Sequence, residues 1–144
     1  MSFDFIQPND DSRQKLEAFI NSLSNENFGK TNPYGWTISA LLGHLAFWEQ
    51  RMLVLLRRWQ EHGVDESPVD PDMINDSLQL ICLALEPRTA ADLCLASAKE
   101  TDAALAAMSP ELFEAIKASP NHYRFNRSLH RNDHLGEMAR ILGR

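Results

Sequence analysis

The chain has 144 residues, of which 44% are hydrophobic and 24% charged, and it carries a formal net charge of −6. These values are ordinary for a globular protein and predict one domain over residues 1–144 with a substantial core. The negative charge argues against nucleic acid or an anionic membrane as the main partner. The opening residues lack the basic and apolar runs of a signal peptide, and every apolar segment is interrupted before it could span a membrane.

The two cysteines, Cys82 and Cys94, have neither metal-binding nor redox spacing. We therefore expect them to be packing residues of a cytoplasmic protein, because the reducing cytoplasm keeps thiols free.

The first two predicted elements are helices. Residues 1–9 are expected to form a loose or extended lead-in, and a first helix capped at one of residues 9–11 then continues to about Leu23. The next helix is the longest: Thr37 caps its start, Gly63 ends it, and its apolar residues recur in steps of three and four.

The middle of the chain predicts two more helical segments separated by a proline. A third helical pattern begins at Asp72, and Pro87 must interrupt or bend it, because proline lacks an N–H and clashes with the preceding turn. Thr89, with Asp92 three residues later, predicts a capped restart, and the helix then continues to Met108.

Two final helices complete the pattern. Ser109 caps a short helix that ends near Ala118, and the last helix runs from about Phe125 to Leu142. Sustained alternation of apolar and polar residues is absent, so no strand is predicted. The fold class is therefore all-α: a four-helix bundle with a short extra helix before the last one.

Three histidines are candidates for chemistry. His130 and His134 lie four residues apart on the last helix and project from one side, so they form a chelating pair for a divalent metal. His44 lies inside the apolar stripe of the long helix, whereas Glu49 falls mostly off it. A buried imidazole must be bonded to something, so the position of His44 requires a reason.

Two interpretations of these histidines stay open on the residues alone. Neighbouring bundle helices approach to about 8–10 Å, which is close enough for His44 and the pair to share one ion and leave a coordination position open. Alternatively, His44 is a core histidine bonded to a backbone carbonyl, and the pair is unrelated. His62 and His122 are expected to be surface residues.

Two short motifs resemble those of a known family. Gly-Trp-Thr at residues 35–37, followed by His-Leu at residues 44–45, resembles the G-W-[ST]…H-L signature of the DinB superfamily, which includes the YfiT-like proteins. The His130-x-x-x-His134 pair is similar to that family's closing motif. The resemblance implies a four-helix bundle, often a homodimer, with a zinc or nickel site on His44, His130 and His134. The family's better-known members are thiol-dependent transferases or isomerases that use low-molecular-weight thiols.

Three charged residues are candidates for catalytic roles beside such a site. Helix geometry places Arg51 near the direction of His44, where it could pair with a substrate anion. Glu137 lies near the direction of the histidine pair, where it could act as a general base or hold a water. Asp133 could accept an imidazole N–H. The stronger expectation for each is a role without chemistry: Arg51 and Glu137 as charges at the edge of the bundle, and Asp133 as a solvated side chain.

The leading hypothesis is a metal-dependent enzyme that activates a thiol or water for transfer or hydrolysis on a small electrophilic substrate. The main alternative is a protective bundle that sequesters a small molecule without turnover. A third is a structural helical dimer, for which Leu55, Leu56 and Trp59 could supply an apolar patch, although these three are expected to lie in the core.

Overall fold

The computed structural model describes residues 3–144, and within that range every regular element is a helix. The all-helical class is confirmed. No helix in this range is both long and apolar enough to cross a membrane. In chain order the elements are α1 (Ile6–Asn21), η1 (Asn27–Gly29), α2 (Ile38–His62), α3 (Pro71–Ala84), α4 (Pro87–Ala106), α5 (Pro110–Lys117), η2 (His122–Phe125) and α6 (Ser128–Ile141).

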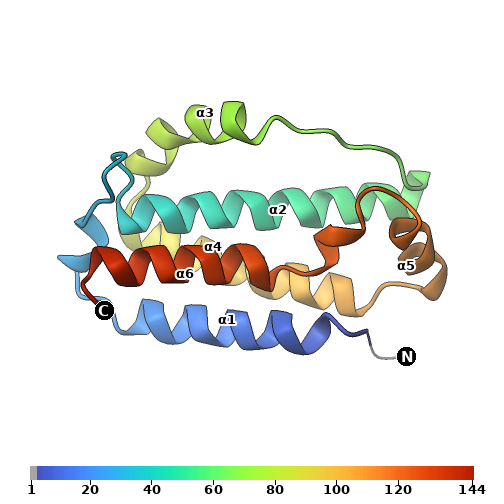
Figure 1. Ribbon diagram of the computed structural model, residues 1–144, viewed down its shortest axis with the longest axis horizontal. Helices are drawn as coiled ribbons and strands as arrows, with labels where there is room; N and C mark the ends of the chain where they lie inside the picture. Colours follow the sequence, from blue (N-terminus) through green and yellow to red (C-terminus); the bar gives the residue numbers. More distant parts are fainter. Residues whose placement is uncertain (1–2) are drawn as a thin grey trace.

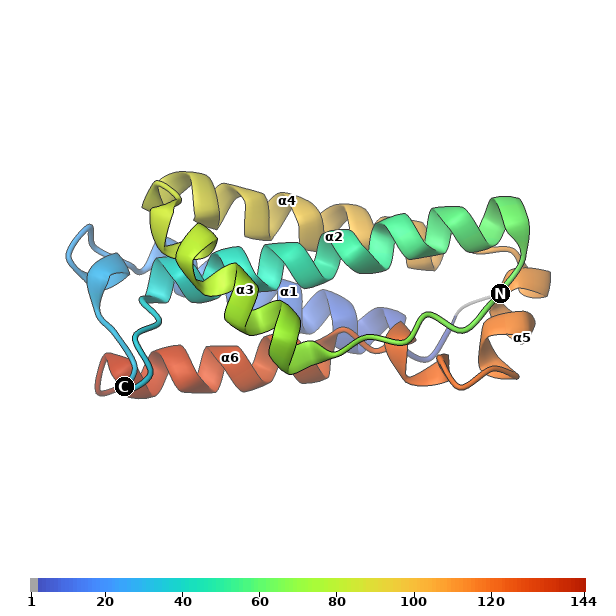
Figure 2. The ribbon, with the colours of Figure 1, turned by 90° about the horizontal axis from the view of Figure 1, so that it is seen from above.

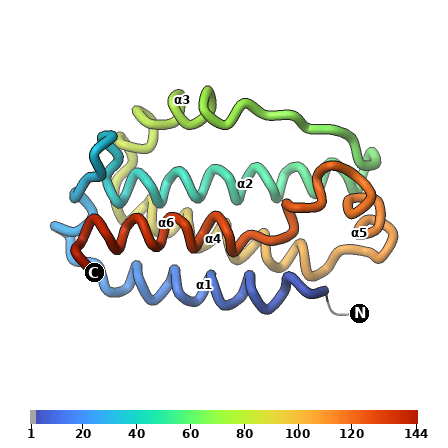
Figure 3. Tube along the Cα trace, in the orientation of Figure 1, coloured from blue at the N-terminus to red at the C-terminus, as the bar shows by residue number. Residues whose placement is uncertain are grey.

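Helices α1, α2, α4 and α6 run along the molecule side by side (Figures 1 and 2). Helix α3 crosses obliquely over α2, while α5 lies at the end of the molecule where α2 ends (Figure 2). An extended segment, residues 63–70, runs back along the molecule from the end of α2 to the start of α3 (Figure 3). This segment and α3 therefore lie on the same side of α2, near the start of α6.

The ends of α2 follow the predicted capping chemistry. The Thr37 side chain accepts a hydrogen bond of 3.0 Å from the backbone N–H of Ala40. At the other end Gly63 adopts φ +87°, a conformation that favours glycine, and its N–H donates to the carbonyl of Trp59. The long helix that carries His44 is thus fixed at both ends by local sequence.

The start of α1 differs from the prediction. The helix begins at Ile6, so most of the expected lead-in is ordered, and residues 1 and 2 lie outside the described residues. Asn9 is no cap: its side chain is buried, donates 2.9 Å to the carbonyl of Phe125 and accepts 2.8 Å from the N–H of Arg127. A residue type typical of helix caps is used here to join α1 to the segment before α6.

Two other boundaries also differ. The predicted break at Pro87 is present, but the cap of α4 is Glu86, whose carboxylate accepts from the N–H of Thr89, so Thr89 lies inside the first turn. The last helix begins at Ser128, because Phe125 belongs to the separate turn η2.

Apolar side chains form two core clusters. One joins α1, α2, α4 and α6 through residues such as Leu16, Leu42 and Met138. The other lies near the end of α2 and includes Leu55, Leu56 and Trp59, which are buried, so they cannot form the exposed dimer patch considered above.

The two cysteines are free thiols, as expected, and both are buried. Burial raises the pKa of each, so neither Cys82 nor Cys94 is an activated thiol near neutral pH.

A buried ionic network ties α6 to α2 and α4. Arg131 and Glu49 are both 0% exposed, and the guanidinium donates to the Glu49 carboxylate at 2.9 Å and to Asp102 at 2.8 Å. Arg13 of α1 also donates to Asp102, and Arg127 donates to Glu49. The expectation that Glu49 lies off the buried face is wrong, because its charge is neutralised by two arginines near the start of α6.

Candidate metal centre

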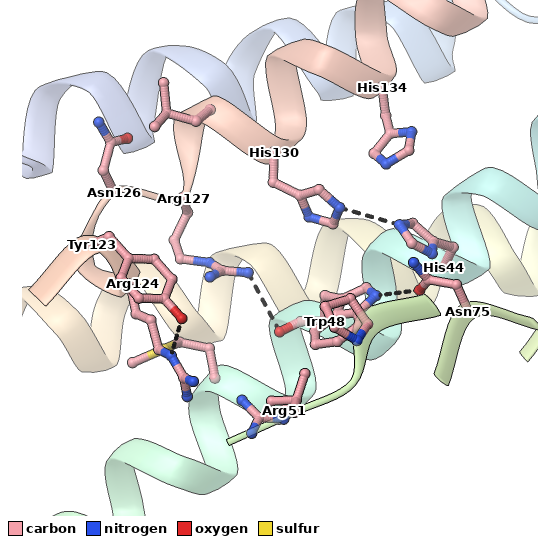
Figure 4. A pocket seen from close by; sticks show the side chains of 14 residues that line it. His44, Trp48, Arg51, Asn75, Tyr123, Arg124, Asn126, Arg127, His130 and His134 are labelled. Carbon is pink, nitrogen blue, oxygen red and sulfur yellow. Dashed lines mark hydrogen bonds between the residues drawn. The ribbon is translucent and has the colours of Figure 1, made fainter. Parts of the chain in front are cut away.

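The structure brings three imidazoles together between α2 and α6 (Figure 4). His44 comes from the first third of α2, and His130 and His134 come from successive turns of α6. Nε2 of His44 lies 3.1 Å from Nε2 of His130. The ring centroid of His134 lies 4.7 Å from that of His44 and 4.8 Å from that of His130. One nitrogen from each ring lies within 4.8 Å of the other two.

These distances fit a divalent ion held by three imidazoles. Two nitrogens bound tetrahedrally at Zn–N distances of about 2.0–2.1 Å lie roughly 3.3 Å apart, close to the observed separation of His44 and His130. Nδ1 of His134 is hydrogen-bonded to Glu137 at 2.9 Å, so its Nε2 is the nitrogen left for a ligand. The side chain of Asn32 donates 3.1 Å to the other carboxylate oxygen of Glu137. A carboxylate that orients a ligating imidazole in this way is typical of metal sites.

Two of the three imidazoles are held neutral by their surroundings. Burial, followed by the charge of His134, lowers the pKa of His44 from 6.5 to about 4. Burial, followed by the charges of His134 and His44, lowers the pKa of His130 from 6.5 to about 3. Since an imidazole binds a metal only in its neutral form, both are ready to ligate at neutral pH.

The alternative explanation of His44 as an ordinary core histidine does not match its contacts. Its Nε2 faces His130 instead of a backbone carbonyl, and its buried Nδ1 has no hydrogen-bond partner among the described residues. The rings of Trp36 and Trp48 present edges to it at 5.7 and 6.4 Å. The imidazole is therefore placed by aromatic packing, with Nε2 directed at the other two histidines.

A cavity of about 450 Å³ lies beside the histidines. Apolar side chains from α2, α6 and the segment before α3 form part of its wall, and three arginines form another part (Figure 4). Trp48 lies between the histidines and Arg51, and its indole N–H donates 3.0 Å to Asn75. The full lining is His44, Trp48, Arg51, Met52, Val69, Pro71, Asn75, Tyr123, Arg124, Asn126, Arg127, Leu129, His130 and His134.

The structure separates the three predicted charged residues. Arg51 lines the cavity, whereas Glu137 is not part of its wall and is hydrogen-bonded to His134. Asp133 is exposed on α6, and its side chain makes no hydrogen bond or ion pair to any residue in the range 3–144. His62 and His122 are exposed, as expected, and are not part of the cavity wall.

Sequence reasoning missed several residues of the cavity, above all Tyr123, Arg124 and Arg127. They lie in or beside η2, a segment that the sequence indicates only as a turn. The signal available was the repeated arginine at residues 124, 127 and 131, but spacing alone does not distinguish an arginine that lines a cavity from one that is paired in the interior.

Comparison with known proteins identifies the family of the chain. The sequence model described as the DinB superfamily matches residues 9–139, so the chain belongs to the DinB superfamily. No curated protein and no solved structure showed significant similarity to the chain.

Proposed function

We propose that this protein is a metal-dependent enzyme, a thiol S-transferase or a hydrolase, in which His44, His130 and His134 hold one divalent ion of zinc or nickel type. The observation that carries the proposal is the convergence of three imidazole nitrogens within 4.8 Å of one another, at the wall of a cavity. Three protein ligands leave a position for substrate or water, which is the pattern of catalytic sites.

A bound divalent ion would lower the pKa of a thiol or water in the open position and so supply a nucleophile near neutral pH. The chain's own residues prepare the site for this chemistry. Glu137 fixes the ring orientation of His134, and we infer that this positioning is its main role, in preference to that of a general base. Trp48, whose ring lies 6.4 Å from that of His44, covers the cavity wall beside the histidines with apolar surface.

The proposal extends to the architecture. We propose that α1, α2, α4 and α6 form the four-helix bundle of a single DinB-like domain, with α3 and α5 as additions. A homodimer stays a prediction, for which the exposed apolar side chains of α3 are the candidate contact surface: Met73, Leu80, Ile81 and Leu83.

A second function, sequestration of a small molecule without turnover, is favoured by one observation. The 3.1 Å contact between His44 and His130 allows one imidazole to donate to the other, which gives a polar cavity wall without any ion. The metal content of protein purified without an affinity tag separates the two functions.

The test is elemental analysis of the wild type and three variants after incubation with zinc and gel filtration. We expect about one ion per chain in the wild type and loss of that ion in His44→Ala. Glu137→Gln keeps the three imidazoles but loses a carboxylate partner, so its zinc affinity should fall roughly 10- to 100-fold. His62→Ala is the matched control, because His62 is an exposed histidine of the same helix. Unchanged zinc in His44→Ala would contradict the proposed ligand set.

A further inference from the structure

The cavity has a second polar region, separate from the histidines. Arg51 of α2 and Arg124 of η2 both direct a guanidinium nitrogen at the carbonyl of Ser67, at 3.2 and 3.0 Å. The two cations therefore converge on one neutral acceptor. Figure 4 places them across Trp48 from the histidines, with Tyr123 beside them. The Tyr123 hydroxyl accepts a further bond from Nε of Arg124 at 3.2 Å.

These two arginines lack the counter-charges that the protein supplies elsewhere. Arg131 is buried against the carboxylates of Glu49 and Asp102. Arg51 and Arg124 have no carboxylate within ion-pair distance anywhere in residues 3–144, and their bonds go to the backbone and hydroxyl groups of residues 67 and 123. A protein of net charge −6 thus leaves two adjacent cations uncompensated at one place in its cavity.

One donor of this pair has no partner at all among the described residues. Arg124 is 8% exposed, and its Nη1 is buried without a hydrogen-bond acceptor. A buried N–H of a cation left without an acceptor costs more free energy than a neutral one, so such a group is retained where something else binds it. Because Arg124 lines the cavity, the missing acceptor is to be found there.

Neighbouring charges do not remove the excess. Arg127 also lines the cavity, but it donates to Glu49 at 3.3 Å and is partly neutralised. Burial lowers the pKa of Arg51, and the nearby positive charges of Arg124 and Arg127 lower it further.

We propose that Arg51 and Arg124 form an anion subsite that binds the carboxylate of a small organic acid, whose other end reaches the three histidines. The planar guanidinium fork matches a carboxylate, and two such forks on one carbonyl leave further N–H groups free. A cavity of about 450 Å³ suits a small molecule. The part of the proposal that concerns the reacting end rests on the proposed function; the anion subsite does not.

The experiment compares three probes by isothermal titration calorimetry on zinc-loaded and on metal-free protein: 3-mercaptopropionate, its methyl ester and inorganic phosphate. The acid and the ester share a thiol and differ in charge. We expect the acid to bind about 10- to 100-fold more tightly than the ester, the range expected for hydrogen bonds to a charged group. The preference should persist in the metal-free protein.

The variants localise the effect. Arg124→Gln should abolish the preference for the acid, and Arg51→Gln, which is the second test if the first variant does not fold, should reduce it. Arg58→Gln is the matched control, because Arg58 is an exposed arginine of α2, the helix that carries Arg51, and its removal changes the net charge equally. Circular dichroism verifies that each variant is folded.

Three outcomes would overturn the subsite. They are equal binding of acid and ester, an equal loss in Arg58→Gln and Arg124→Gln, and tighter binding of phosphate than of 3-mercaptopropionate, which would assign the arginines to a phosphoryl group. Absence of zinc with an intact acid preference would instead refute the metal-dependent function and leave the subsite standing.

Discussion

Keeping His44 and His130 neutral links the stability of the metal-free protein to pH. In the folded state their pKa values are about 4 and 3, whereas in the unfolded chain both have the ordinary value of 6.5. Between these values the unfolded chain binds protons that the folded protein does not. The free energy of unfolding is therefore highest above pH 6.5, where both rings are neutral in either state, and it decreases as pH falls toward 4.

We therefore expect the free energy of unfolding to fall by on the order of 3 kcal/mol for His44 alone between pH 7 and pH 4. Urea titrations at several pH values, in the presence of a chelator, measure it. His44→Phe should remove the His44 part of this dependence and leave that of His130, whereas His62→Ala should leave the whole dependence unchanged. A wild-type stability that is constant from pH 7 to pH 4.5 would refute the assignment of the shifted groups.

Single residues were predictable where their pattern is local. His44 stands out because it interrupts an apolar stripe, and His130 and His134 stand out by their spacing. The burial of Glu49 could not be predicted, since it depends on arginines that lie about eighty residues later in the chain. Periodicity treats any carboxylate as solvent-facing, and only the fold shows which carboxylates are paired.

At the scale of the element, α2 positions His44, and its first turn lies next to the site. Thr37 caps the helix one residue after Trp36, whose ring packs on His44 at 5.7 Å. Asn32 connects this turn to α6, because its carboxamide oxygen accepts the N–H groups of Tyr34 and Trp36 while its nitrogen donates to Glu137. Thr37, which caps α2, and Asn32, which holds the carboxylate partner of His134, thus belong to one short segment before the helix.

Removing the cap should therefore affect the fold by a predictable amount. Thr37→Ala leaves the N–H of Ala40 without its acceptor and should cost about 1 kcal/mol of stability, measured by urea unfolding. Thr37→Ser should restore most of it. Ser77→Ala is the control, because the Ser77 hydroxyl is exposed and bonds only within its own helix. Equal losses in Thr37→Ala and Ser77→Ala would show that the cap contributes nothing.

The number and order of the helices were predictable from proline, glycine and apolar spacing, which are local signals. The exact first residue of a helix was less predictable where a residue of a typical capping type makes a different contact. The side chain of Asn9 is hydrogen-bonded to the backbone of residues 125 and 127, and Glu86 caps α4 in place of the more typical Thr89. Such choices depend on what packs around the turn, and sequence spacing does not contain that information.

At the scale of the whole molecule, the network of Arg131, Glu49 and Asp102 fixes α6 against α2 and α4. Apolar packing tolerates small rotations of a helix, but a guanidinium that donates to two carboxylates has a defined direction. Because Arg131 directly follows His130, the same contact that fixes α6 also fixes the face on which the histidines lie.

Arg131→Met should cost about 3–5 kcal/mol of unfolding free energy, since it leaves two carboxylates buried with less compensation. The double variant Glu49→Leu/Arg131→Met removes one of these charges too and should be more stable than Arg131→Met alone. Urea unfolding of the two single variants and the double variant gives the coupling energy. Strictly additive losses would show that the network acts as independent surface charges do.

The network also has a consequence for temperature. The hydration of charged groups becomes less favourable as water is warmed, so the penalty for burying Arg131 and its two carboxylates shrinks on heating. The orientation of α6, and with it the arrangement of the three imidazoles, should consequently be maintained well in warm conditions and be relatively less secure in the cold.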